Sequence, residues 1–170
     1  MKNKIISISA ISSALSVVIL ILGTYVSVID ISCVFTCSLI IMLPLYKKSI
    51  MGAFLSYLST CFLAIILTGL RFNVIIPYAV FFGLHPIVNE IQITKKLNKW
   101  LCLIVKTIWF VGSLFIIYYF TNMFVGLNDK IIKFIYYFIP IAGAILFIPY
   151  DFFILYTRKK VDIILGNIGL

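Results

Sequence analysis

Charged side chains are scarce in this sequence of 170 residues, and acidic ones are the scarcest. Charged residues make up 11% of the chain, with 5 Asp+Glu against 14 Lys+Arg, whereas 64% of the residues are hydrophobic. A typical soluble domain is about 25% charged and about 45–50% apolar. These values, with a mean hydropathy of +1.20, exclude an ordinary soluble enzyme, a nucleic-acid-binding domain and a disordered chain. They are typical of a polytopic membrane protein.

Motifs for catalysis and metal binding are also missing. The chain has one histidine, His85, which excludes a His-Glu-x-x-His zinc site and any multi-histidine metal cluster. It has no Walker A phosphate loop and no Gly-x-Ser-x-Gly nucleophile elbow. An intramembrane serine protease needs a histidine or lysine beside its serine, and both candidates, His85 and Lys106, fall near a predicted interface. We therefore predict that the chain is not an enzyme and holds no metal and no cofactor.

The four cysteines lie in or beside apolar runs and form no Cys-x-x-Cys motif. Cys33 and Cys37 are four residues apart, a helical spacing that is usually too wide for a disulfide. We expect all four to be small hydrophobic side chains of the interior.

Long apolar runs fill most of the sequence. A hydrocarbon core of about 30 Å needs roughly 20 helical residues per crossing, so 170 residues fit about six crossings. We predict an all-α bundle of six transmembrane helices in a single integral membrane domain, residues 1–170. The predicted spans are 5–28, 32–45, 50–67, 74–91, 100–124 and 131–156. The first run is longer than the apolar core of a signal peptide, so we expect it to be a retained helix.

The basic residues cluster between the apolar runs, which predicts their topology. With both termini in the cytoplasm, the inner segments carry ten lysines and arginines and the outer segments carry three. The inner ten are Lys2, Lys4, Lys47, Lys48, Lys95, Lys96, Lys99, Arg158, Lys159 and Lys160, and the outer three are Arg71, Lys130 and Lys133. Lys106 falls within the fifth span, where its side chain can snorkel to the inner interface. We expect Arg158, Lys159 and Lys160 to end the sixth span.

Small residues form a stripe along the first predicted span. Ala10 and Ala14 are four residues apart and share one face of a helix, with Ser7 on the same side. Small side chains allow a second helix to approach closely. Two interpretations stay open: packing within this chain, or docking of a partner's helix at Ala10 and Ala14.

Polar and aromatic residues gather at the predicted outer face. Such a set, with one charge of each sign, suits a small amphipathic ligand, although an aromatic belt with solvated loop charges has the same composition. The candidate substrate-binding residues are Tyr25, Asp30, Thr36, Arg71, Asn73 and Asn122.

A second polar set falls near the predicted inner face. His85 and Asn89 share a helix face, and Asp151 lies inside the sixth span, where a carboxylate is costly unless it is paired or reaches water. A bond from Asp151 to His85, Tyr150 or Lys106 would form a structural polar lock between the fourth and sixth spans. The alternative is a docking surface or gate that faces the cytoplasm.

The layout resembles the S components of energy-coupling-factor transporters, the substrate-capturing membrane subunits of bacterial vitamin importers. Six spans, both termini inside, Ala10 and Ala14 on the first helix, and a short second span before a basic turn and Gly52-Ala53 carry this resemblance. Residues 82–87 and 149–151 look like segments of small clostridial membrane proteins of S-component type. The resemblance implies that Ala10 and Ala14 contact a transmembrane coupling subunit and that substrate binds under residues 24–32 and 68–73.

The expected function is therefore the capture of a small, vitamin-like nutrient for uptake across a bacterial plasma membrane, together with coupling and ATPase subunits. The alternative is a non-transporting six-helix scaffold of the rod-shape-determining type. A ligand-sized pocket near Asp30 and Arg71 distinguishes the two, because only the capture protein needs one.

Overall fold

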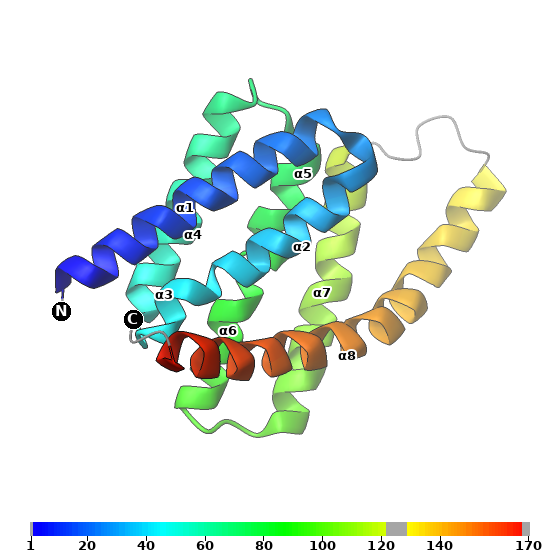
Figure 1. The fold of residues 1–170 in the computed structure, drawn as a ribbon. Coiled ribbons are helices and arrows are strands. Elements are labelled where there is room, and N and C mark those ends of the chain that lie inside the picture. Colours follow the sequence, from blue (N-terminus) through cyan, green and yellow to red (C-terminus); the bar gives the residue numbers. More distant parts are fainter. Residues whose placement is uncertain (1, 122–128, 168–170) are drawn as a thin grey trace.

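The computed structural model describes residues 2–121 and 129–167, and these residues are helical apart from short connections (Figure 1). No strand occurs within either range. The elements in chain order are α1 (Lys2–Tyr25), η1 (Ser27–Ile29), α2 (Asp30–Ile40), α3 (Met42–Tyr46), α4 (Ile50–Leu67), α5 (Phe72–Pro77), η2 (Tyr78–Phe82), α6 (His85–Thr94), α7 (Lys99–Thr121) and α8 (Asp129–Asn167).

Six segments of the described chain are long and apolar enough to cross a membrane. They are Asn3–Tyr25, Ser27–Tyr46, Ile50–Leu67, Phe72–Thr94, Lys99–Phe120 and Tyr136–Ile164. The predicted all-α architecture is confirmed, as is the presence of six apolar helices of membrane-spanning length. By length and composition, the chain is a multi-pass membrane protein.

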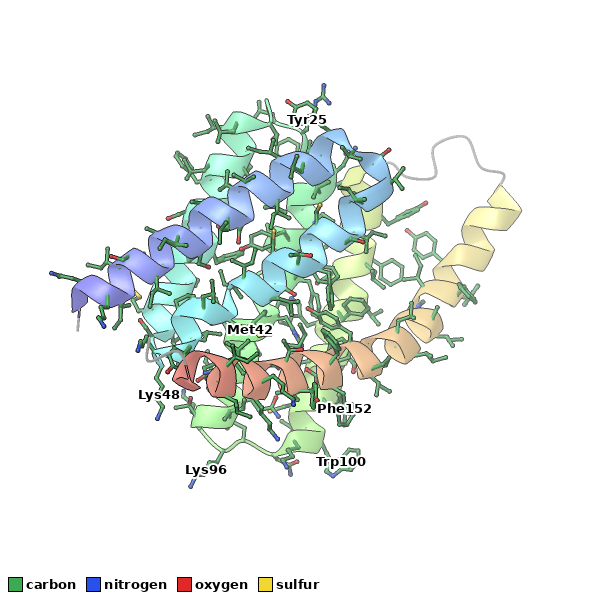
Figure 2. The ribbon with its side chains drawn as sticks, in the orientation of Figure 1. Tyr25, Met42, Lys48, Lys96, Trp100 and Phe152 are labelled. Atoms are coloured by element: carbon green, nitrogen blue, oxygen red, sulfur yellow. The ribbon has the colours of Figure 1, made fainter. Side chains whose placement is uncertain are left out.

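The bundle has two chemically different ends (Figure 2). Lys48, Lys96 and Trp100 lie at one end, which we call the lysine end, and Tyr25 lies at the opposite end. The connections α3–α4 and α6–α7 meet at the lysine end, whereas α1–α2 and α4–α5 meet at the Tyr25 end.

The serine side of α1 faces the interior. Ser12, Ser13 and Ser16 are buried, and the hydroxyl of Ser12 donates to the carbonyl of Ile40 at 3.0 Å. Across the α1–α4 contact, a Cβ added to Gly52 would lie 2.7 Å from the Ser9 hydroxyl. Small side chains therefore bring α1 close to both α2 and α4.

The fourth span is not a continuous α-helix, because Pro77 interrupts it. Proline has no N–H to donate to a backbone hydrogen bond. The residues that follow it, Tyr78–Phe82, form a π-helical turn. The N–H of Gly83 bonds the carbonyl of Tyr78 five residues back at 2.8 Å. The carbonyl of Ala79, which Gly83 would otherwise bond, accepts the hydroxyl of Tyr57 at 2.7 Å.

The last helix is longer than predicted. The basic triplet 158–160, which we expected to end the sixth span, lies inside α8, since this helix continues to Asn167. Its 39 residues correspond to about 58 Å at about 1.5 Å per residue, nearly twice the thickness of a hydrocarbon core. In Figure 1 the C-terminal half of α8 turns and crosses the lysine end of the bundle. Arg158, in this half of α8, is buried and bonded within the protein.

Gly83 provides a test of the close packing behind the π-helical turn. A Cβ at Gly83 would lie 2.6 Å from the Tyr57 ring and 2.8 Å from the Tyr78 ring, so Gly83→Ala should lower the free energy of unfolding by about 1–3 kcal/mol. At Gly112 in α7 an added Cβ meets nothing within 4 Å. Gly112→Ala should therefore leave the free energy of unfolding unchanged or raise it by about 0.5–1 kcal/mol. Unfolding in detergent measures both, and equal effects would contradict this packing.

Candidate functional site

A cluster of four polar side chains lies inside the bundle, contributed by three helices. Asp151 comes from α8, His85 and Asn89 come from α6, and Lys106 comes from α7. Each of the four is at most 4% exposed. Lys106 is seven residues, about 10 Å, from the first residue of α7, so the cluster lies in the half of the bundle nearer the lysine end.

The carboxylate of Asp151 is the centre of this cluster. The ammonium of Lys106 donates to its two oxygens at 2.7 and 2.8 Å, and also to the amide oxygen of Asn89 at 2.9 Å. The amide nitrogen of Asn89 donates to Asp151 Oδ1 at 3.2 Å, and Nε2 of His85 lies 3.0 Å from the same oxygen. The charges of Lys106 and Asp151 neutralise each other, which removes most of the cost of burying either one.

Aromatic rings enclose the histidine of the cluster. The His85 ring centroid lies 5.0 Å from those of Phe81 and Tyr150 and 5.6 Å from that of Phe147. Phe81, Phe147 and Phe110 form an apolar core between η2, α7 and α8. This apolar surrounding separates the cluster from water and strengthens its hydrogen bonds.

A second ion pair lies closer to the lysine end. The guanidinium of Arg158 donates to the two carboxylate oxygens of Glu90 at 2.8 and 3.3 Å, to the carbonyl of Leu45 at 2.9 Å, and to the carboxylate of Asp162. Arg158 thereby holds α8 against α3 and α6. Sequence reasoning missed this pair because it placed Arg158 at the end of the sixth span and assigned it no partner. The spacing of seven residues from Asp151, which places Arg158 on the same helix face, is a signal that could have found it.

The structure thus brings the three residues of the predicted polar lock, His85, Asn89 and Asp151, into contact. Lys106 completes the set. Of the two roles that the sequence analysis gave this lysine, the structure shows the bond to Asp151 and not the snorkelling to the interface, since only 2% of it is exposed. A matching carboxylate at the same depth makes the buried position favourable.

A small cavity lies at the opposite end of the bundle, between α2, α5 and η2. Its volume is about 50 Å³, and it is lined by Asp30, Ile31, Val34, Asn73, Val74, Pro77 and Phe82. Two of the predicted substrate-binding residues, Asp30 and Asn73, therefore share one cavity. Pockets for drug-sized ligands are roughly 300–1,000 Å³, so this cavity is much smaller than a vitamin needs.

The other predicted substrate-binding residues are placed differently. The guanidinium of Arg71 lies over the ring of Tyr25, 5.0 Å from its centroid. These two side chains contact each other and do not line the cavity. Thr36 is exposed on α2, bonds the carbonyl of Ser32 at 2.7 Å and does not line the cavity. Asn122 lies outside the described residues.

The two alanines of α1 are exposed on the outside of the bundle. The neighbouring serines face the interior, so the contacts of α1 with α2 and α4 leave Ala10 and Ala14 uncovered.

Among the described residues, no three of His, Cys, Asp and Glu are grouped as metal ligands would be. All four cysteines are free, with Cys33 and Cys37 buried and the other two half-buried.

The chain matches no family model, and searches against curated proteins and solved structures find no match either. The assignment of a function therefore depends on the sites themselves.

The pairing of Lys106 with Asp151 gives a testable stability prediction. Asp151→Leu leaves the ammonium of Lys106 buried without its counter-charge and should lower the free energy of unfolding by about 3–5 kcal/mol. The double variant Asp151→Leu with Lys106→Met removes both charges and should recover most of this loss. Unfolding of the purified protein in detergent measures both.

Lys99→Met, which changes an exposed lysine on the same helix, is the matched control and should have little effect. A double variant no more stable than Asp151→Leu alone would contradict the pairing.

Proposed function

We propose that this protein is a membrane subunit that captures a small nutrient at the Tyr25 end and releases it at the lysine end. Its environment would be a bacterial plasma membrane, with both termini in the cytoplasm. The observation that carries the proposal is the difference between the two ends. Buried ion pairs join the helices in the half nearer the lysine end, whereas a cavity with polar residues lies at the other.

The distribution of basic residues supports the orientation. The lysines of the α3–α4 and α6–α7 connections meet at one end, where the positive-inside rule favours the cytoplasm. Tyr25, Asp30 and Arg71 then face the exterior, where a nutrient arrives.

The packing supports a division between a fixed half and a movable half. Alternating access requires two packings of similar stability. The Asp151 cluster and the Arg158 pair fix α3, α6, α7 and α8 relative to one another, and both depend on exact partners. The cavity is too small for a vitamin-like ligand, so binding one requires α2 and α5 to separate at the Tyr25 end.

The exposed stripe on α1 supports a partner. Ala10 and Ala14 present little side-chain bulk to the outside, so a helix of a coupling subunit could approach the α1 backbone closely. ATPase subunits bound to that partner would supply the energy, since the chain has no Walker A motif.

Ligand screening tests the capture function. Vitamins, amino acids and nucleobases are added one at a time to the detergent-purified protein, and the unfolding temperature is measured. A captured ligand at 100 times its Kd should stabilise the folded state by about 2.7 kcal/mol. The variant Asp30→Asn should weaken that effect, whereas Asp162→Asn at the lysine end should not.

The second candidate function is a non-transporting membrane scaffold, which the small volume of the cavity favours. A scaffold needs contacts with other membrane proteins and no internal ligand site. Absence of any ligand hit, together with purification free of ATPase and coupling subunits, would replace the capture function by this one.

Bulk added to the α1 stripe should interfere with the partner. Ala10→Leu and Ala14→Leu should each reduce co-purification of the coupling subunit at least tenfold and leave the unfolding temperature nearly unchanged, because both positions are exposed. Gly112→Leu adds similar bulk to an open position on α7 and serves as the control. Undiminished co-purification after both alanine changes would remove the stripe from the docking surface.

A further inference from the structure

The C-terminal half of α8 extends beyond the length that a membrane crossing needs. About 20 helical residues cross a hydrocarbon core, whereas α8 has 39 residues. A crossing that begins at Tyr136, the first residue of the apolar segment, ends near Leu155. The rest of the helix, up to Asn167, turns across the lysine end (Figure 1) and so falls at the level of the lipid headgroups.

One face of this segment is fixed to the bundle. Asp151, Ile154 and Arg158 are spaced by three and four residues, so they share a helix face, and all three are buried. The guanidinium of Arg158 donates to the carbonyl of Leu45 at 2.9 Å and to the carboxylate of Glu90. These bonds also fix the rotation of the helix, so the opposite face points away from the bundle.

The outward face mixes apolar side chains with lysines. More than half of Phe152, Tyr156 and Ile163 is exposed, and Lys159 and Lys160 are exposed between them. Large apolar side chains are costly in water, and lysines are costly in hydrocarbon. The boundary between headgroups and acyl chains accommodates both, because a lysine stem can lie along apolar surface while its ammonium reaches a phosphate.

The charge around this outward face is positive. Arg158 bonds the carbonyl of residue 45, which holds the turn with lysines 47 and 48 beside α8. The carboxylates of Glu90 and Asp162 both bond Arg158, so this region has five basic residues and two acidic ones. Clusters of roughly four to eight basic residues just beyond a membrane-spanning helix attract anionic lipids.

We propose that the outward face of α8 binds anionic phospholipids, with the headgroup phosphate at Lys159 and Lys160 and the start of the acyl chains against Phe152 and Tyr156. The ammonium of Lys160 lies over the ring of Tyr156, 5.5 Å from its centroid, so a cation and an apolar surface occur together at one place. A zwitterionic headgroup carries its own cation beside its phosphate and should bind more weakly. This inference goes beyond nutrient capture and does not depend on it.

Lipid binding to the detergent-purified full chain tests the proposal. Dioleoyl-phosphatidylglycerol and dioleoyl-phosphatidylcholine, which share acyl chains and differ in headgroup charge, are titrated in separate samples. Native mass spectrometry counts the bound lipids. We expect the anionic lipid to bind roughly tenfold more tightly than the zwitterionic one. Free glycerol phosphate should not displace it, because it lacks the chains that contact the apolar residues.

Variants locate the binding on α8. Lys159→Gln with Lys160→Gln should weaken phosphatidylglycerol binding roughly tenfold and leave phosphatidylcholine binding unchanged. Lys159→Arg with Lys160→Arg keeps both charges and should preserve the affinity. Lys95→Gln with Lys96→Gln removes the same charge from the α6–α7 connection and is the matched control, with a much smaller effect expected. All four lysines are exposed, so the unfolding temperature should not change.

The other outcomes overturn the proposal. Equal affinity for the two lipids, or a preference that survives the double glutamine change on α8, would assign this face to a protein partner or to water. An equal loss in the Lys95 and Lys96 control would show attraction by the whole lysine end and no site on α8. Displacement by glycerol phosphate would show a site for a free anion. None of these results bears on capture, since no variant changes the Tyr25 end.

Discussion

The neutralisation of buried charge is the constraint on which the rest of this structure depends. Lys106 and Asp151 lie among apolar helices, and neither side chain could remain there as an unpaired ion. Their contact, with the bonds to His85 and Asn89, fixes how α6, α7 and α8 pack. Arg158 extends the same principle two turns further along α8, where Glu90 and the Leu45 carbonyl hold the end of the helix across the bundle.

This constraint makes the two halves of the bundle differ in how they are packed, which the composition alone does not reveal. The half nearer the lysine end is held by directional bonds centred on Asp151 and Arg158. At the Tyr25 end, the cavity is lined mainly by non-directional apolar contacts, and its one carboxylate has no counter-ion within the described chain. The proposed capture function would use this difference, with one half kept constant while the other adapts to a ligand.

The sequence predicted an all-helical chain with six apolar helices of membrane-spanning length, because the cost of exposing polar backbone and charge to lipid depends on local composition. It also indicated the meeting of His85, Asn89 and Asp151, since a carboxylate inside an apolar run needs a partner. It missed the partners of Arg158 and left Lys106 with two possible roles, because a basic residue near a boundary has the same local pattern whether it faces water or a distant carboxylate. The π-helical turn after Pro77, the small cavity and the outward side of Ala10 and Ala14 depend on how helices tilt and rotate against one another. Hydropathy carries no such information.

The inward arginine of the last helix has a consequence for biogenesis. While α8 emerges from the ribosome, Asp151 and Arg158 have no counterparts within their own helix except Asp162, because Lys106 and Glu90 belong to earlier spans. The buried charges of the final helix are therefore paired only once it packs against α6 and α7. We expect the C-terminal helix to pack last, against helices that are already in the membrane.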